Sequence, residues 1–161
     1  RKSDGLILSK DIIFNISVTL WRRLAKWTVG WVPDAAEREV AKRHAEELDV
    51  RTPSLEQTVG NLSGGNQQKV SIAKWLAAEA DILIVDEPTI GIDIKTKDAL
   101  HELIWDLAKT GKAILLISSD MPEMVRLADR ILVMKGGRIV AEIENSRRYD
   151  EISEEIMKDL A

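Results

Sequence analysis

The chain has 161 residues, a formal net charge of -4 and no cysteine. Its length allows one domain with a real hydrophobic core, its negative charge argues against nucleic-acid binding, and the absence of cysteine excludes disulfides and thiolate metal sites. The first residue is Arg1 rather than methionine, so we expect a fragment of a longer protein.

The first sixty residues predict a small helical unit. The pattern of residues 12–24 favours a helix. A second helix is predicted to begin at Asp34, with Glu37 three residues later as its partner in a capping box. Nothing in residues 1–60 has the alternating pattern of a strand.

A loop of small residues follows at 62–68, which reads LSGGNQQ and opens into a helix predicted over 66–78. Gly64 and Gly65 carry no Cβ, so the backbone can approach an anion closely. The helix N-terminus presents unpaired N–H groups and the positive end of its dipole, and Ser63 adds a hydroxyl donor. The pattern indicates a phosphate-binding turn, although an ordinary turn before a helix can have the same residues.

The next predicted element is a strand at 82–86, which begins with four large apolar residues and ends in the carboxylates of Asp86 and Glu87. Such a run is typical of a central parallel strand that is buried on both faces. Carboxylates at the C-terminal end of such a strand lie where α/β sheets bind ligands. Asp86 is therefore a candidate Mg²⁺ ligand through water, and Glu87 a candidate base for an attacking water. A strand that ends in a solvated acidic turn is the alternative.

The rest of the chain alternates between helical and strand patterns. The pattern predicts a helix over 95–109, a strand over 113–117 and a short helix over 120–128. A hairpin of 131–134 with 138–143 around two glycines and a final helix over 152–160 follow. Helices that alternate with buried strands predict an α/β fold with a layered sheet.

The LSGGNQQK and ILIVDEP segments resemble the signature and Walker B motifs of the ATP-binding cassette (ABC) ATPases, in the same order and at a fitting spacing. The chain is similar to the C-terminal two-thirds of such a nucleotide-binding domain. The resemblance implies a partial domain of the P-loop ATPase type. Its helical subdomain would lie in 1–60, and the signature helix, Walker B and a mostly parallel sheet flanked by helices in 61–161.

Three segments are similar to one branch of that family. LSGGNQQK, the RKSDGL start and the later SSDMPE stretch resemble the second cassette of bacterial monosaccharide importers of the ribose, xylose and galactose class. The resemblance implies a fragment of the ATP-hydrolysing subunit of a sugar importer, with ATP and Mg²⁺ as cofactors. Two cassettes of the family sandwich ATP head to tail, and each signature serves the nucleotide held by the other cassette.

The family's site residues carry over to matching positions of this chain. The resemblance implies nucleotide binding by Ser63, Gly64, Gly65, Gln67 and Asp93. It implies Mg²⁺ binding through water for Asp86, catalysis for Glu87 and the switch position for Ser119.

The resemblance also implies partners and a location. The partners would be a second cassette in the same polypeptide or a dimer mate, transmembrane permease subunits and, indirectly, a periplasmic sugar-binding protein, with no nucleic acid. The location would be peripheral, on the cytoplasmic face of the bacterial inner membrane. Trp21, Trp27 and Trp31 either help to form the surface that docks on the permease or pack the core of the subdomain itself.

The chain departs from the family pattern in several places. It contains no G-x-x-x-x-G-K-[ST] phosphate loop, so we expect the isolated chain to be inactive. The glutamine of the family's Q-loop and the aromatic residue that stacks on adenine are also missing. The switch histidine of the family aligns with Ser119. His44 and His101 fall on helices away from the motifs and are expected to be solvated.

Two other classes of protein stay open at this point. One is a soluble ABC-type ATPase that acts on DNA or ribosomes, although such proteins usually carry long coiled coils or basic linkers that this sequence lacks. The other is a non-catalytic regulatory domain that has kept the fold. The intact Asp86-Glu87 pair argues against complete loss of catalytic function.

Overall fold

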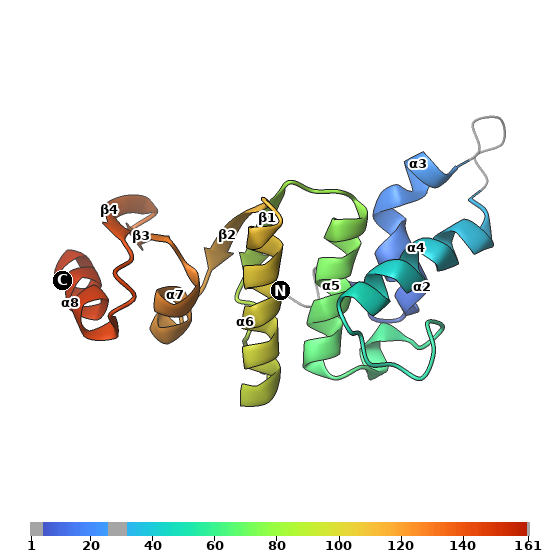
Figure 1. Ribbon diagram of the computed structural model, residues 1–161, viewed down its shortest axis with the longest axis horizontal. Helices are drawn as coiled ribbons and strands as arrows, with labels where there is room; N and C mark the ends of the chain where they lie inside the picture. Colours follow the sequence, from blue (N-terminus) through green and yellow to red (C-terminus); the bar gives the residue numbers. More distant parts are fainter. Residues whose placement is uncertain (1–4, 26–31, 161) are drawn as a thin grey trace. The chain divides into compact units, whose positions relative to one another are not determined.

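The structure is a computed structural model that describes residues 5–25 and 32–160 (Figure 1). The chain forms two compact units, which are Arg1–Leu83 with Pro88–Ile114 and Ile84–Glu87 with Leu115–Ala161. The proposed division into a helical subdomain and an ATPase part at residue 60 follows family resemblance rather than compactness, and it stays a prediction.

The first unit is mainly helical. Its helices are α2 (Ile12–Ser17), the 3₁₀ turn η1 (Val18–Leu20), α3 (Trp21–Leu24), α4 (Asp34–Glu47), the 3₁₀ turn η2 (Val59–Asn61), α5 (Gly64–Ala77) and α6 (Ile94–Lys109). Helices α2, α4 and α5 pack against one another, and α6 runs beside α5 (Figure 1). Ile12, Ile16 and Val70 are fully buried in this unit, so its core joins the start of the chain to the signature helix.

Residues 12–24 are helical as predicted, but the expectation of a single helix is wrong. The α-helix α2 ends at Ser17, and a 3₁₀ turn separates it from α3. The β-branched residues Val18 and Thr19 lie at this break, and such residues lose side-chain freedom in an α-helix. The hydroxyl of Thr19 also donates to the carbonyl of Lys74 in α5 at 3.2 Å, so this turn is held by a tertiary contact.

The predicted capping box at the start of α4 is also wrong. The helix begins at Asp34, and no side chain caps it. Glu37 instead accepts hydrogen bonds at its Oε1 atom from the hydroxyl of Ser17 and the indole N–H of Trp21, each at 2.6 Å. Its carboxylate therefore ties α4 to α2 and α3 rather than to its own N-terminus.

Trp21, one of the three tryptophans proposed for a docking surface or a core, packs within the helical unit. The ring of Trp21 lies edge-on to Phe14, with centroids 5.2 Å apart, while 38% of the residue stays exposed. Trp27 and Trp31 lie outside the described residues, so both alternatives stay open for them.

Strands β1 (Ile82–Asp86) and β2 (Ala113–Ile117) pair with each other. The N–H of Ala113 donates to the carbonyl of Asp81 at 2.9 Å, and the N–H of Glu87 donates to Ile117 at 2.8 Å. Because both ends pair in the same order, the two strands run parallel.

The expected burial of the first strand on both faces is wrong. Leu83 and Val85 are buried, but Ile82 and Ile84 are 68% and 67% exposed. Leu115 and Ile117 of β2 are also exposed. The described chain thus covers one face of this strand pair, and the other presents apolar side chains to solvent.

The second unit has its own small core. Helix α7 (Met121–Leu127), the antiparallel strands β3 (Arg130–Lys135) and β4 (Arg138–Glu144), and helix α8 (Tyr149–Leu160) form it. The buried side chains are Val125, Ile131, Val133, Ile143, Ile152 and Ile156. The predicted hairpin is confirmed, and its turn residues Gly136 and Gly137 have φ of 59° and 75°, the left-handed values that a tight two-residue turn requires.

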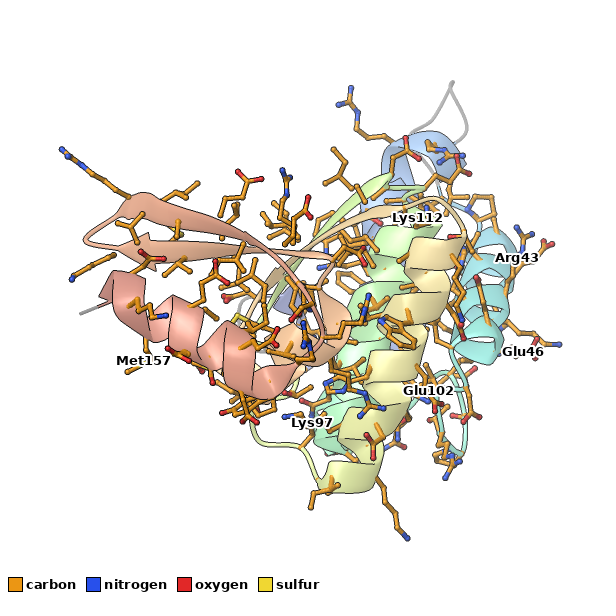
Figure 2. All side chains as sticks on the ribbon, turned by 60° about the vertical axis from the view of Figure 1, so that its left-hand side comes forward. Arg43, Glu46, Lys97, Glu102, Lys112 and Met157 are labelled. Carbon is orange, nitrogen blue, oxygen red and sulfur yellow. The ribbon has the colours of Figure 1, made fainter. Side chains whose placement is uncertain are left out.

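Two smaller expectations about side chains need correction. His101 is buried in α6 with 3% exposure, whereas a solvated residue was predicted. The spacing of Ile152, Ile156 and Leu160 predicts an apolar stripe on the last helix, but Leu160 is 39% exposed, so the buried part of the stripe ends at Ile156. The charged side chains of Arg43 and Glu46, in contrast, point away from α4 (Figure 2). No described helix combines the length and apolar character needed to cross a bilayer.

Candidate functional site

The signature helix begins two residues earlier than the sequence predicted. Helix α5 starts at Gly64, and Ser63 is its N-cap, with its Oγ atom accepting from the N–H of Asn66 at 3.4 Å. Both glycines therefore lie in the first turn, where N–H groups have no partner within the helix. Ser63 is exposed and Gly64 is half-buried, so the Ser63 hydroxyl reaches solvent beside the positive end of the helix dipole.

Asn66 is a residue of this motif to which the sequence analysis gave no role. Its Nδ2 atom donates to Ser63 Oγ at 3.1 Å, and its Oδ1 atom accepts from the N–H of Arg51 at 2.9 Å. Its place directly after the two glycines was the available signal, but Arg51 is distant in sequence, and only the fold brings it close.

Gln67 uses its side chain within the protein. Its amide nitrogen donates to the carbonyls of Val59 and Leu62, at 3.3 Å and 3.0 Å. These bonds hold the chain that leads into the signature. The proposed nucleotide contact of Gln67 stays a prediction, and it would have to involve the amide oxygen.

Gly65 lies in close contact with α6. A Cβ atom built on Gly65 would lie 2.0 Å from the Cγ2 atom of Thr96, far inside van der Waals contact. Gly65 is also buried. The structure thus gives this glycine a packing role, while the approach to an anion that the sequence suggested stays a prediction.

Asp93 caps α6 with both carboxylate oxygens. Its Oδ1 atom accepts from the N–H of Thr96 at 3.1 Å, and its Oδ2 atom accepts from the Thr96 hydroxyl at 2.6 Å. The hydroxyl bond, and after it the backbone bond, lowers the pKa of Asp93 below its usual value. Thr96 therefore contacts both the signature turn and the N-cap of α6, because its methyl group packs on Gly65 and its hydroxyl donates to Asp93. The contact of Asp93 with nucleotide stays a prediction.

We expect Asp93 to make the stability of the chain depend on pH in the acidic range. A carboxyl group with a lowered pKa in the folded state stabilises the fold above its unfolded pKa, whose usual value is 3.8, and this contribution is lost as the pH falls through the lowered value. Asp93→Asn is the matched variant, since asparagine also caps helices but does not titrate. Urea unfolding between neutral and acidic pH should show a steeper loss for the unchanged chain, and equal pH slopes would contradict the assignment.

Glu87 is held in an unusual backbone conformation at the end of β1. Its φ is 47°, in the left-handed region that few residues other than glycine adopt. Its Oε1 atom accepts from the N–H of Ser119 at 2.8 Å. The structure therefore brings together Glu87 and Ser119, the candidate base and the switch position, through the main chain of the switch residue.

A buried carboxylate supports the switch loop. Glu123 is 1% exposed, and its Oε2 atom accepts from the Ser118 hydroxyl at 2.5 Å. Ser118 Oγ accepts in turn from the N–H of Asp120 at 3.0 Å, and Asp120 caps α7 by accepting from the N–H of Glu123 at 2.9 Å. The sequence analysis gave Ser118 and Glu123 no role. They fix the loop that presents the Ser119 N–H to Glu87.

Whether Asp86 can bind Mg²⁺ depends on the other ligands of the ion. Within residues 5–25 and 32–160, no three His, Cys, Asp or Glu side chains converge on a possible metal position. Mg²⁺ commonly takes only one or two carboxylates and completes its shell with water and substrate phosphates. Asp86 is exposed at the end of β1, and its role as a Mg²⁺ ligand stays a prediction.

These motifs and the fold define an ATP-binding cassette. Residues 7–90 match the family model of the ABC transporter, and the chain belongs to that family. Among solved structures it is similar to the ATP-binding cassette MJ1267, with a TM-score of 0.77, 19% identity and coverage of 95% of this chain and 63% of that one. It is also similar to the cassette MJ0796 in its post-hydrolysis state bound to ADP and Pi, with a TM-score of 0.70, 24% identity and coverage of 86% and 58%. At this identity the two structures support the fold.

Within the family, several similar curated proteins are named as ATP-binding proteins of sugar import. The chain is 45% identical over 144 residues to a ribose import ATP-binding protein of Roseobacter denitrificans, covering 89% of this chain and 28% of that protein. It is 46% identical over 152 residues to an arabinose import ATP-binding protein of Rhizobium meliloti, covering 94% and 29%. It is 43% identical over 157 residues to a xylose import ATP-binding protein of Geobacillus kaustophilus, covering 98% and 30%. The chain thus spans less than a third of the length of each of these relatives.

Proposed function

We propose that this chain is part of the second nucleotide-binding cassette of a bacterial monosaccharide importer, in the subunit that hydrolyses ATP. The names of its relatives support the sugar-import role, since they include ribose, arabinose and xylose import proteins. The observation that carries the chemical part of the proposal is the signature turn. There the exposed Ser63 hydroxyl caps the 14-residue helix α5.

In this proposal the signature binds the γ-phosphate of ATP that a second cassette holds. The N-terminus of α5 supplies unpaired N–H groups, a positive dipole end and the Ser63 hydroxyl, all of which stabilise an anion. Phosphoryl transfer is catalysed mainly by positioning and by electrostatic stabilisation of phosphate oxygens. This helix end would therefore contribute to turnover at the partner's nucleotide.

The cassette's own site is proposed to use Asp86 and Glu87. Asp86 would hold Mg²⁺ through water, and the ion would neutralise charge on the phosphates. Glu87 would orient the attacking water, but one of its oxygens already accepts from the N–H of Ser119. Ser119 itself lacks the imidazole that the family uses at this position. We infer that this site is weaker than the one served by Ser63.

The remaining parts of the proposal concern partners and location. The subunit would work at the cytoplasmic face of the bacterial inner membrane, together with permease subunits and, through them, a periplasmic sugar-binding protein. The choice of sugar would reside largely in those other subunits, because the motifs of this chain recognise phosphate.

The proposal predicts a clear difference between the chain and the assembled importer. The sequence contains no phosphate loop, so the isolated chain should bind Mg-ATP more weakly than about 1 mM and show no turnover. The full-length subunit with its permease partners should hydrolyse Mg-ATP. Calorimetry and a phosphate-release assay test both statements. Micromolar binding with turnover by the isolated chain, or an inactive full-length assembly, would contradict the proposal.

A further inference from the structure

The side chain of Asn66 connects the signature turn to the segment that follows α4. Its amide bonds the N–H of Arg51 at 2.9 Å on one side and the hydroxyl of Ser63 at 3.1 Å on the other. The backbone N–H of Asn66 also reaches Ser63 Oγ at 3.4 Å. Asn66 thus contacts Ser63 twice and is itself held from a distant part of the chain.

The Arg51 bond determines which way the amide of Asn66 points. A backbone N–H can only donate, so the Asn66 atom that faces Arg51 must be the acceptor Oδ1. The Nδ2 atom, which can only donate, must then face Ser63. A main-chain contact from Arg51 therefore fixes the side chain of Asn66 as a donor to Ser63 Oγ.

This arrangement determines the direction of the Ser63 hydroxyl hydrogen. A hydroxyl oxygen has two acceptor positions and one hydrogen to donate. Both donors from Asn66 approach the oxygen of Ser63, so its hydrogen is directed elsewhere. Within the described parts of the chain the Ser63 hydroxyl donates to no protein acceptor, and Ser63 is exposed. The hydrogen is available to an anion in solvent.

The segment that holds Asn66 is anchored at a second point on α5. Lys69 Nζ donates to the carbonyl of Asp49 at 2.8 Å and lies 3.6 Å from its carboxylate. Asp49 has a φ of 48°, and its carboxylate lies 3.4 Å from Arg51 Nε. The turn that carries Arg51 is therefore held to α5 at two separate points, by Asn66 and by Lys69.

We propose that Asn66 is a positioning residue that keeps the Ser63 hydroxyl as a hydrogen-bond donor toward the γ-phosphate of ATP bound by the partner cassette. This inference rests on the proposed function, in which Ser63 contacts that phosphate. Asn66 acts through Ser63 and does not itself touch the nucleotide. Its loss frees the Ser63 hydroxyl to rotate, which weakens a contact that is needed in the transition state more than in ATP binding.

Steady-state ATPase assays on the full-length importer test this role. Ser63→Ala removes the donor and should lower kcat about 100-fold. Asn66→Ala should lower kcat about tenfold and leave the KM for ATP within about twofold. Asn66→Asp keeps the acceptor for Arg51 but replaces the donor to Ser63 with a second acceptor, so it should lose at least as much as Asn66→Ala. The double variant of Ser63→Ala with Asn66→Ala should be no slower than Ser63→Ala alone.

Lys69→Met is the matched control. It removes the second anchor of the same turn, keeps the aliphatic stem and leaves both bonds to Ser63 in place. Its kcat should stay within about twofold of the unchanged protein. A loss as large as that of Asn66→Ala would mean that bracing of the turn, rather than orientation of Ser63, is what matters, and it would overturn the proposal.

The other outcomes separate this inference from the function on which it rests. If Ser63→Ala is slow and both Asn66 variants are unimpaired, the positioning role is wrong and the proposed function stands. If Ser63→Ala itself is unimpaired, the proposed signature contact fails. A further loss when Asn66→Ala is added to Ser63→Ala also overturns the positioning role. The thermal midpoint of each variant separates loss of fold from loss of turnover, and Asn66→Asp, which keeps the Arg51 bond, decides the case if Asn66→Ala unfolds.

Discussion

Replacing Gly65 with alanine should lower the free energy of unfolding of the chain by about 1–3 kcal/mol, the usual cost of overpacking a closely packed contact. The new methyl group would lie 2.0 Å from Thr96 Cγ2, so α5 and α6 would have to move apart or the Thr96 side chain would have to rotate. Alanine favours helix over glycine by only about 0.5–1 kcal/mol, which does not offset the clash. Urea unfolding followed by circular dichroism measures the change.

Thr96→Ser provides the matched rescue. Serine lacks the Cγ2 atom but keeps the hydroxyl that bonds Asp93. The double variant should be more stable than Gly65→Ala alone, and the two changes should be strongly non-additive because the residues are in contact. Additive effects would show that Gly65 is not limited by Thr96. ATPase activity of the full-length double variant adds a second readout: recovered stability with turnover still lost would mean that Gly65 is needed at the nucleotide as well.

The sequence predicted the order and type of most elements from hydrophobic periodicity. The spacing of Leu100, Leu103, Ile104 and Leu107 predicts the buried face of α6, and all are buried except Leu103, which is half-buried. The start of α5 was missed because glycines have low helix propensity, and a run of two suggested a loop. The N-cap bond from Asn66 to Ser63 and the packing of Gly65 outweigh that propensity.

The failed predictions of strand burial and helix capping concern contacts between segments that are distant in sequence. Ile82 and Ile84 are apolar enough for a central strand, and whether they are covered depends on elements that local sequence does not reveal. Glu37 fits a capping box by spacing, but two donors from α2 and α3 bind its carboxylate instead. The local sequence pattern indicates which side chains can be buried or can cap a helix, and tertiary contacts determine which of them do so.

The same division holds for the candidate site. Spacing and residue type selected Ser63 and Glu87, the family resemblance selected Ser119, and the structure places an N–H of Ser119 on Glu87. The contacts that support the site were missed because the partner residues lie far apart in sequence. Asn66 depends on Arg51, and Gly65 depends on Thr96.

Ser63→Arg in the full-length importer should abolish most ATP turnover. It replaces the exposed N-cap of α5 with a bulky charged side chain at the helix end that the proposal places against the partner's γ-phosphate. Arginine also lacks an oxygen to accept from Asn66, so the cap is lost. Because positioned contacts to phosphate oxygens supply most of the catalysis of phosphoryl transfer, we expect a loss of about 100-fold or more.

Glu87→Gln in the same protein should cost far less. Glutamine keeps an oxygen that can accept from the N–H of Ser119, so the switch loop is retained and only the candidate base of the cassette's own site is removed. Steady-state ATPase and sugar-import rates of the two variants, measured side by side, test the central claim that this cassette mainly serves its partner's ATP. We expect severe loss for Ser63→Arg and mild loss for Glu87→Gln. Equal and severe losses would contradict it and would make Glu87 a working catalytic base.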